Sequence, residues 1–242
     1  MPMRLFRLPI RRALLALALL AASTPGARAQ VGHPPGDSPY QDLIQRQSLT
    51  PIFGSFGGNG GKLRIGPHSG TTYGLRYDIR VSNPVQFGFG LSTGNFDRLI
   101  VDADDSVATR VKGPVSQSVT LIGLTLQWNL TGTKTWHNLA PYWSGGLGIA
   151  IAGKTAADTS GYNFGNKFYL TPAIGLRYFP TRRLHLRLEA GQVFWKLKYP
   201  TAYLDQPTDQ PGTTTSNAVI TDGKIDQWTG GRWLVAGLGY SF

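Results

Sequence analysis

The residues best suited to chemistry are four histidines, His33, His68, His137 and His185. A histidine that contacts a serine and is itself oriented by a carboxylate can activate that serine as a nucleophile. Only His68, in the stretch GPHSG beside Ser69, offers such a neighbour at a suitable level of the predicted strands. A dipeptide of this kind is more often an ordinary loop sequence, and that interpretation is the stronger one.

A second candidate is the acidic stretch VDADDS, which contains Asp102, Asp104 and Asp105. Carboxylates bind Ca²⁺ well, but a calcium loop also needs a glycine at its turn and a bidentate glutamate at a fixed distance. Neither follows here, so a solvated acidic loop is favoured. The chain also lacks a phosphate-binding loop, a metal-ligand spacing and a nucleophile elbow. We therefore predict no enzyme, and no catalytic, cofactor-binding or metal-binding residues.

Alternation of apolar and small or polar residues is the dominant pattern, and it is typical of β-strands with two different faces. It predicts strands at 72–82, 85–93, 117–130, 141–153, 167–179, 185–199 and 227–242, with a weaker eighth at 51–65. The apolar face carries residues such as Leu124 and Leu126, and the other face is mostly Gly, Ser, Thr and Gln.

The predicted connections alternate between short ones, at 83–84, 131–140 and 180–183, and long ones, at 94–116, 154–166 and 200–226. Short turns at one end and long loops at the other are typical of transmembrane barrels, which close because lipid cannot satisfy a free strand edge. A soluble sandwich would expose a more charged face to water. We therefore predict an all-β fold, a closed antiparallel up-and-down transmembrane β-barrel of eight strands.

Aromatic residues fall near both ends of the predicted strands, where interfacial girdles are expected. One set lies near the short turns: Trp128, Trp136, Tyr142, Trp143, Tyr178, Phe179, Tyr240 and Phe242. The other lies near the long loops: Phe96, Phe168, Tyr169, Trp195, Tyr199 and Trp228.

The first 29 residues have a basic start, a ten-residue apolar run at 13–22 and a cleavage-type ending Ala27-Arg28-Ala29. We expect a signal peptide at 1–29, a mature start at Gln30, a periplasmic leader at 30–50 and a barrel at 51–242. The leader contains a possible short helix at 40–48, and a flexible segment is the alternative. Five arginines lie in 1–29, so the remainder carries +6 of the chain's +11 charge, spread too evenly for nucleic-acid binding. With no cysteine, disulfides and lipidation at a lipobox are excluded.

The chain resembles the small outer-membrane β-barrel superfamily, of which the eight-stranded transmembrane domain of outer-membrane protein A is the type. The likeness rests on APYWSGGLGIAIAG at 140–153, LTPAIGLRYFPTRRLHLRLEAG at 170–191 and the terminal GLGYSF. It implies residence in an outer membrane, contact with lipid and lipopolysaccharide, and recognition by the barrel-assembly machinery. In that family the terminal strand is the assembly signal, and the matching residues here are Leu234, Ala236, Leu238, Tyr240 and Phe242.

Two features depart from a regular barrel strand. Pro172 lies inside a strand, where it cannot donate to the ladder, so a bulge or a position above the membrane is expected. After Gly191 the apolar residues change parity, to Val193, Trp195 and Leu197, which a bulge at Gly191-Gln192 would explain.

The parity of the strands also predicts a network of charges in the lumen. Its members are Arg76, Asp78, Arg80, Arg177, Arg187 and Glu189. If Val81 pairs with Val85 across the turn, Gly88 and Gly90 lie opposite the long charged side chains and give them room. Isolated charges in a narrow lumen are costly, so we expect ion pairs between them, and a rise in conductance when Glu189 is removed.

The sequence therefore favours a non-enzymatic monomeric barrel with a side-chain-filled lumen, which serves envelope structure or surface interaction through its long loops. A narrow pore for small solutes is the alternative, and a lipid-modifying barrel enzyme is a third possibility.

Overall fold

The fold was analysed on a computed structural model, which describes residues 38–205 and 217–242. The strands are β1 (Tyr40–Asp42), β2 (Gln47–Gly58), β3 (Ser69–Arg80), β4 (Val85–Val101), β5 (Val111–Asn129), β6 (Lys134–Trp136), β7 (Leu139–Ile151), β8 (Asn166–Tyr178), β9 (Leu184–Lys198) and β10 (Asp226–Ser241). A turn of 3-10 helix follows β9 at Thr201–Leu204. No helix among the described residues is long and apolar enough to cross a membrane.

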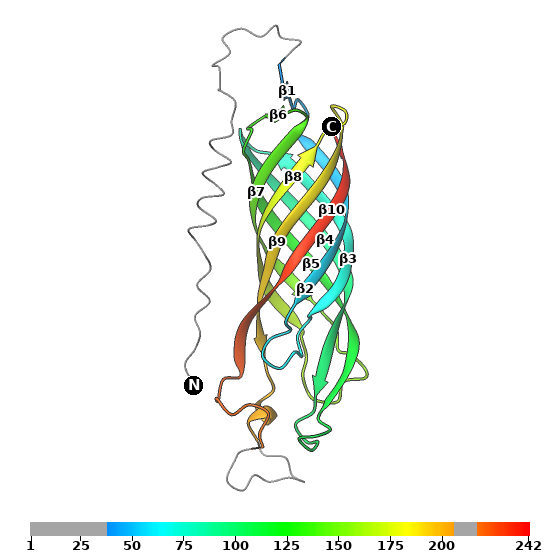
Figure 1. Cartoon of the computed structure of the whole chain (residues 1–242), viewed down its shortest axis with the longest axis vertical. Coiled ribbons are helices and arrows are strands. Elements are labelled where there is room, and N and C mark those ends of the chain that lie inside the picture. The colour runs from blue at the N-terminus through cyan, green and yellow to red at the C-terminus, as the bar shows by residue number, and fades with distance from the viewer. Residues whose placement is uncertain (1–37, 206–216) are drawn as a thin grey trace, which may run out of the picture. The chain divides into compact units, whose positions relative to one another are not determined.

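Eight of these strands form a closed antiparallel barrel (Figure 1). The order is β7-β5-β4-β3-β2-β10-β9-β8, and pairing of β7 with β8 closes the ring. Each barrel strand pairs with the next barrel strand along the chain, and the first and last barrel strands, β2 and β10, pair with each other. The predicted fold class is therefore confirmed: the chain is an eight-stranded up-and-down barrel.

The connections alternate in length as expected. Short ones follow β3 and β8, and the connection after β5 contains the small hairpin of β6 and β7. Its two turn residues, His137 and Asn138, both have positive φ, as a tight two-residue hairpin turn requires. The β4–β5 loop is shorter than predicted, because β4 continues to Val101 and β5 begins at Val111.

The leader differs from the expectation. The helix proposed at 40–48 is wrong: Tyr40–Asp42 is β1, which pairs with β6, and Gln47 already begins the first barrel strand. The weak eighth strand, predicted at 51–65, is β2 at Gln47–Gly58, and it pairs with β3 on one side and with β10 on the other. Residues 30–37 of the leader, and the signal peptide expected at 1–29, lie outside the described residues.

Side chains alternate between the lumen and an outer face rich in exposed apolar groups. On β5, for example, Ile122, Leu124 and Leu126 are exposed while Leu121 and Gln127 are buried. An exposed apolar belt of this kind, on a sheet with no free edge, is what a hydrocarbon environment requires. At about 3.3 Å per residue and a tilt of about 40°, the 19 residues of β5 extend roughly 45 Å, well beyond an apolar band of about 25 Å. The long-loop end of the barrel therefore projects out of the membrane.

The expected bulge at Gly191-Gln192 is absent. The register between β9 and β10 runs without a shift from Asp226–Lys198 to Tyr240–Leu184. Val193, Trp195 and Leu197 are apolar and buried because they point into the lumen, whose contents change from polar to apolar at this level. The bulge expected at Pro172 is also absent, since the register of β8 is the same on both sides of it, although the ladder with β9 lacks pairs at Thr171 and Pro172.

Candidate functional site: the filled lumen and the long-loop cap

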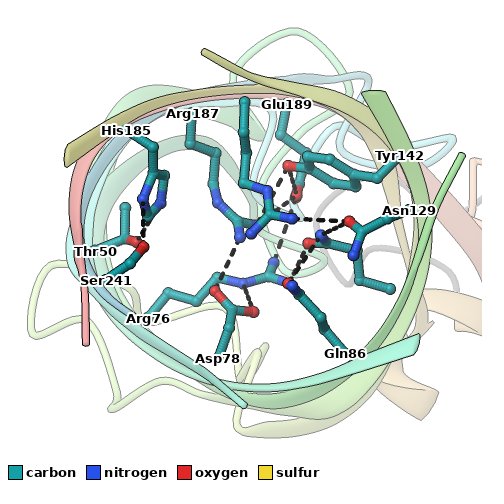
Figure 2. Close-up of polar contacts among 12 residues, drawn as sticks. Thr50, Arg76, Asp78, Gln86, Asn129, Tyr142, His185, Arg187, Glu189 and Ser241 are labelled. Carbon is teal, nitrogen blue, oxygen red and sulfur yellow. Dashed lines mark hydrogen bonds and ion pairs between the residues drawn. The ribbon is translucent and has the colours of Figure 1, made fainter. Parts of the chain in front are cut away.

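The half of the lumen next to the short turns is crossed by a charge network (Figure 2). Arg76 and Asp78 lie two residues apart on β3, and the Arg76 Nε donates to Asp78 Oδ1 at 2.8 Å. From β9, the Arg187 Nη2 donates to Asp78 Oδ2 at 2.9 Å. The side chains of Asp78 and Arg187 are each 1% exposed. One carboxylate thus joins two arginines on different sides of the lumen.

Glu189, on the same face of β9 as Arg187, joins this network from the side nearer the long loops. Its Oε2 lies 3.4 Å from Arg76 Nη1 and 3.5 Å from Arg187 Nη1. The Tyr142 hydroxyl donates to the same oxygen at 2.8 Å and accepts from Arg187 Nη1 at 3.2 Å. The tyrosine was assigned to the outer girdle, which is wrong: it is buried in the lumen and completes the network.

Arg177 binds a ladder of amides instead of a carboxylate. Its Nη2 donates to Asn129 Oδ1 at 2.9 Å, and Gln127 Nε2 donates to the same oxygen at 2.8 Å. Gln127 Nε2 also reaches Gln86 Oε1 at 3.2 Å. Arg80, the sixth predicted member, lies apart at the short-turn mouth, where it donates to the Gln45 backbone oxygen at 2.8 Å. Five of the six predicted charges therefore gather inside the barrel.

Glycines make room for the network. The register pairs Arg76 with Gly90 and Asp78 with Gly88, as the turn at Val81 and Val85 predicted. A Cβ at Gly88 would lie 2.6 Å from Asp78 Oδ1, and one at Gly175 would lie 2.2 Å from the Tyr142 ring. A side chain at either position would displace Asp78 or Tyr142 from the network, so glycine at these two positions is what lets both take their places.

The mouth of the barrel at the short-turn end is closed by a further layer of side chains, beyond the charge network. His185 lies between Thr50 and Ser241, with ring nitrogens 3.3 Å from each hydroxyl oxygen (Figure 2). The Phe179 ring lies 5.2 Å from this ring, tilted by 35°, and packs with Leu43 of the segment that follows β1. His185 is therefore a buried packing histidine, and Phe179, assigned to the outer girdle, is part of an internal lid.

The half of the lumen next to the long loops is filled by an apolar core. The ring of Phe56 contacts the rings of Phe96 and Trp195, with centroid distances of 5.4 Å and 5.3 Å. Leu121, Tyr169 and others continue the core. The second outer girdle is consequently wrong in four members, Phe96, Tyr169, Trp195 and Tyr199, which are buried inside. Phe168 and Trp228 do face outward, as expected.

The core continues into the loops, which form a folded cap. Arg98, at the end of β4, forms an ion pair with Asp158 of the β7–β8 loop at 2.6 Å, and both side chains are 1% exposed. The Arg98 guanidinium lies over the Tyr162 ring, and the Tyr203 hydroxyl donates to the Val101 backbone oxygen at 2.5 Å. We name the set Arg98, Asp158, Tyr162 and Tyr203 the loop cap.

The electrostatics of the loop cap favour its charged form. Burial alone would raise the pKa of Asp158, but hydrogen bonds from Ser160 and Arg98 outweigh it and lower that pKa below its usual value. The sequence interpretation missed this pair. A signal was available for Arg98, because it continues the lumen-facing parity of Ser92, Gly94 and Phe96, but the predicted strand ended at residue 93.

The candidate chemical residues are not assembled into a site. Ser69 Oγ donates to Asp97 Oδ2 at 3.1 Å, and no hydrogen bond joins the side chains of His68 and Ser69 in the described part of the chain. Lys112 lies 3.7 Å from Asp102 and 2.5 Å from Asp105, so a lysine occupies the acidic loop. Within 38–205 and 217–242, no group of three or more His, Asp or Glu side chains has a metal-binding arrangement.

The residues assigned to the assembly signal lie on the outer face of β10. Leu234, Leu238, Tyr240 and Phe242 are exposed, and Ala236 shares their parity. Backbone bonds between Phe242 and Gln47, at 2.9 Å and 3.1 Å, join the last residue to the start of β2. The aromatic girdle at this end is real in its remaining members, with Trp128 and Trp143 stacked at 4.0 Å.

No protein-family model matches the chain, and no curated protein matches it. Among solved structures, it is similar to the N-terminal β-barrel domain of Pseudomonas aeruginosa OprF (14% identity, 82% of this chain, 98% of that chain, TM-score 0.44). It is also similar to the outer membrane protein OprG from Pseudomonas aeruginosa (13%, 85%, 99%, 0.49) and to Neisserial surface protein A (13%, 85%, 98%, 0.44). The fold assignment rests on the closed strand ladder of this chain itself.

Proposed function

We propose that this chain is an integral, non-enzymatic barrel of a bacterial outer membrane that conducts little or nothing and presents its loop cap to partners at the cell surface. The exposed apolar belt supports membrane insertion, because groups such as Leu124 and Leu147 would otherwise face water. Short turns then face the periplasm and the long loops face outward, in contact with lipid and lipopolysaccharide.

The observation that carries this proposal is that the lumen is blocked at successive levels. Leu43 and Phe179 close the short-turn mouth, the charge network of Asp78 and Arg187 crosses the next level, and the aromatic core around Trp195 closes the other half. A solute would have to displace all three layers. No comparable observation favours the narrow pore or the lipid-modifying enzyme.

The loop cap supports the surface role. Loops held by a buried ion pair and by Tyr203 present a defined surface, whereas unanchored loops would lose conformational entropy on binding a partner. Insertion by the barrel-assembly machinery through the terminal strand, and a monomeric state, belong to the same proposal.

Liposome swelling tests the closed lumen. Liposomes that contain the purified barrel are expected to swell in isotonic arabinose at the rate of protein-free liposomes, and swelling that scales with the amount of barrel contradicts the proposal. The surface role is tested by a pull-down with the barrel and with Asp158→Asn, which loosens the cap and leaves the belt intact. Equal recovery of each surface partner by both proteins contradicts a role for the cap.

A further inference from the structure

Between the charge network and the aromatic core lies a cavity of about 80 Å³. A single water needs about 10–15 Å³ of such space, so the cavity holds several waters or one small molecule. Arg76, Arg187 and Glu189 line it on the side of the charge network, and Tyr169 and Trp233 line it on the side of the aromatic core. It is thus charged on one side and aromatic on the other.

The charge network as a whole carries an excess of positive charge. Its three arginines, Arg76, Arg177 and Arg187, face two carboxylates, Asp78 and Glu189, and the arginine bonded to an amide, Arg177, does not line the cavity. The Nε of Arg187 is buried with no acceptor among the residues that the structure describes. An unbalanced buried cation is costly, and a carboxylate is the group that a guanidinium binds best. The Glu189 carboxylate also lines the cavity, but three donors already engage its Oε2.

The cavity reaches the barrel wall at a seam, a stretch of the β8–β9 ladder that lacks its pairs. β8 and β9 pair at Leu170–Phe194 and again at Ala173–Gly191, and the pairs between these two are missing. Pro172 has no N–H to donate there, and the register on both sides places it opposite Gln192. Both residues have outward parity and are exposed, yet both line the cavity.

The seam lies at membrane depth, since exposed apolar residues flank it on β8, Leu170 on one side and Ile174 on the other. Unpaired backbone at that depth is tolerated only where it lines a cavity, because lipid cannot satisfy it. On the outer side of the seam, Gln192 pairs with Arg232 of β10, and both are exposed. A cation on the lipid face is unusual, and here it stands beside the entrance.

From these observations we infer that the cavity is a binding site for a small amphipathic monocarboxylate, which enters from the lipid phase through the seam at Pro172 and Gln192. Arg187 and Arg76 bind the carboxylate, and the short apolar tail packs against Tyr169 and Trp233. Arg232 attracts the headgroup at the entrance. The inference goes beyond the proposed function: a closed lumen can hold this site, and the site can fail while the barrel remains non-conducting.

Binding is tested with 3-bromopropionate and the barrel in non-ionic micelles, because bromine quenches a tryptophan that it contacts. Saturable quenching is expected in the wild type and is expected to disappear in Trp233→Phe. The cation of similar length, 3-bromopropylamine, is expected to give no saturable phase. Quenching that never saturates, or that is equal for the acid and the amine, overturns the proposal.

A glycine pair supplies matched variants. Gly90 lines the cavity, and a Cβ there meets nothing nearer than 4.0 Å, so Gly90→Leu fills the cavity without a clash at the backbone. This variant should bind the acid at least about tenfold more weakly than the wild type does. Gly153, which is exposed just after β7 and has open space around its Cβ position, serves as the control, and Gly153→Leu should bind like the wild type. Arg187→Gln should also lose binding, and Gly90→Leu decides the matter if that variant does not fold. Equal affinity in Gly90→Leu and the wild type overturns the site.

Entry through the seam is tested by a disulfide cross-link. The chain has no cysteine of its own, so only the introduced cysteines can form a disulfide. Pro172→Cys with Gln192→Cys closes the seam when oxidised, and the pair Ile174→Cys with Ala190→Cys cross-links the intact ladder next to it. Oxidation should slow the binding of 3-bromopropionate by at least about tenfold in the first variant only, and reduction should restore it. An unchanged rate in the oxidised seam variant overturns lateral entry.

Discussion

Asp78 on β3 and Arg187 on β9 meet across the lumen at 2.9 Å, although two other strands, β2 and β10, separate them along the barrel wall. The same carboxylate also accepts from Arg76. The network therefore ties distant parts of the wall together, and each buried charge depends on partners that come from another strand.

Removal of Asp78 should destabilise the barrel strongly. Asp78→Ala leaves Arg76 and Arg187 buried without this carboxylate, and the expected loss in the free energy of unfolding is about 3–5 kcal/mol. Urea unfolding in vesicles, followed by tryptophan fluorescence, measures it. The double variant Asp78→Ala with Arg187→Met should lose less than the sum of the single variants, and strict additivity contradicts a direct coupling.

A charge on the apolar belt should cost more than one on the projecting rim. Leu124→Arg places a cation near the middle of the belt and should reduce the unfolding free energy by about 2–4 kcal/mol. Ser118→Arg, on the same outer face of β5 near the long loops, should cost about 0–1 kcal/mol. Equal costs for the two variants in the urea assay contradict the placement of the membrane.

The loop cap should open in acid before the barrel does. The pKa of Asp158 is lowered in the folded cap, so its stabilising contribution is complete above the unfolded value of about 3.9 and is lost as the pH falls through the folded value. The protection factors for hydrogen exchange of residues 152–165, which are corrected for the pH dependence of the unfolded chain, should therefore fall below about pH 4. In Asp158→Asn, protection should already be low at pH 7 and should vary less with pH. A wild-type cap that stays protected at pH 2 contradicts this role of Asp158.

The side chain of Phe242 should matter for insertion more than its backbone bonds do. Phe242→Ala keeps the two backbone bonds with Gln47 but removes the exposed terminal ring. If the terminal strand is an assembly signal, the amount of folded barrel in the outer membrane should drop several-fold, measured by heat-dependent mobility in gels. The control is Trp228→Ala, an exposed aromatic at the other end of β10. Similar levels for both variants count against the assembly signal.

The outer face of this barrel was predictable from the sequence, and the lumen was predictable only in part. Alternation identified the strands, and parity placed Asp78, Arg187 and Glu189 inside together. The aromatic core was missed because alternation does not say which face is the lumen. Trp195 alternates as well as Leu188 does, but it points the other way.

The remaining errors have a common physical origin in contacts between distant residues. The segment after Tyr40 has a helix-like composition, yet β6 supplies a partner strand and the segment extends. Asp158 lies in a polar loop, and its neighbours in the sequence predict a solvated side chain. The barrel brings it into contact with Arg98, which lies 60 positions earlier in the chain. Local sequence patterns do not predict contacts between residues so far apart in the chain.

The closed lumen also changes one expectation about Glu189. From the sequence, loss of this carboxylate is expected to raise conductance. However, the aromatic core on the long-loop side of the network does not depend on Glu189 and should still block the lumen. Glu189→Ala should therefore be less stable in the urea assay without becoming a channel.

Single-channel recording in planar bilayers tests the central claim most directly. With the purified wild-type barrel and with Glu189→Ala, the account predicts no steady conductance above the bare bilayer, because the lid, the charge network and the aromatic core block the lumen in series. Large, steady channels in the wild type would contradict it.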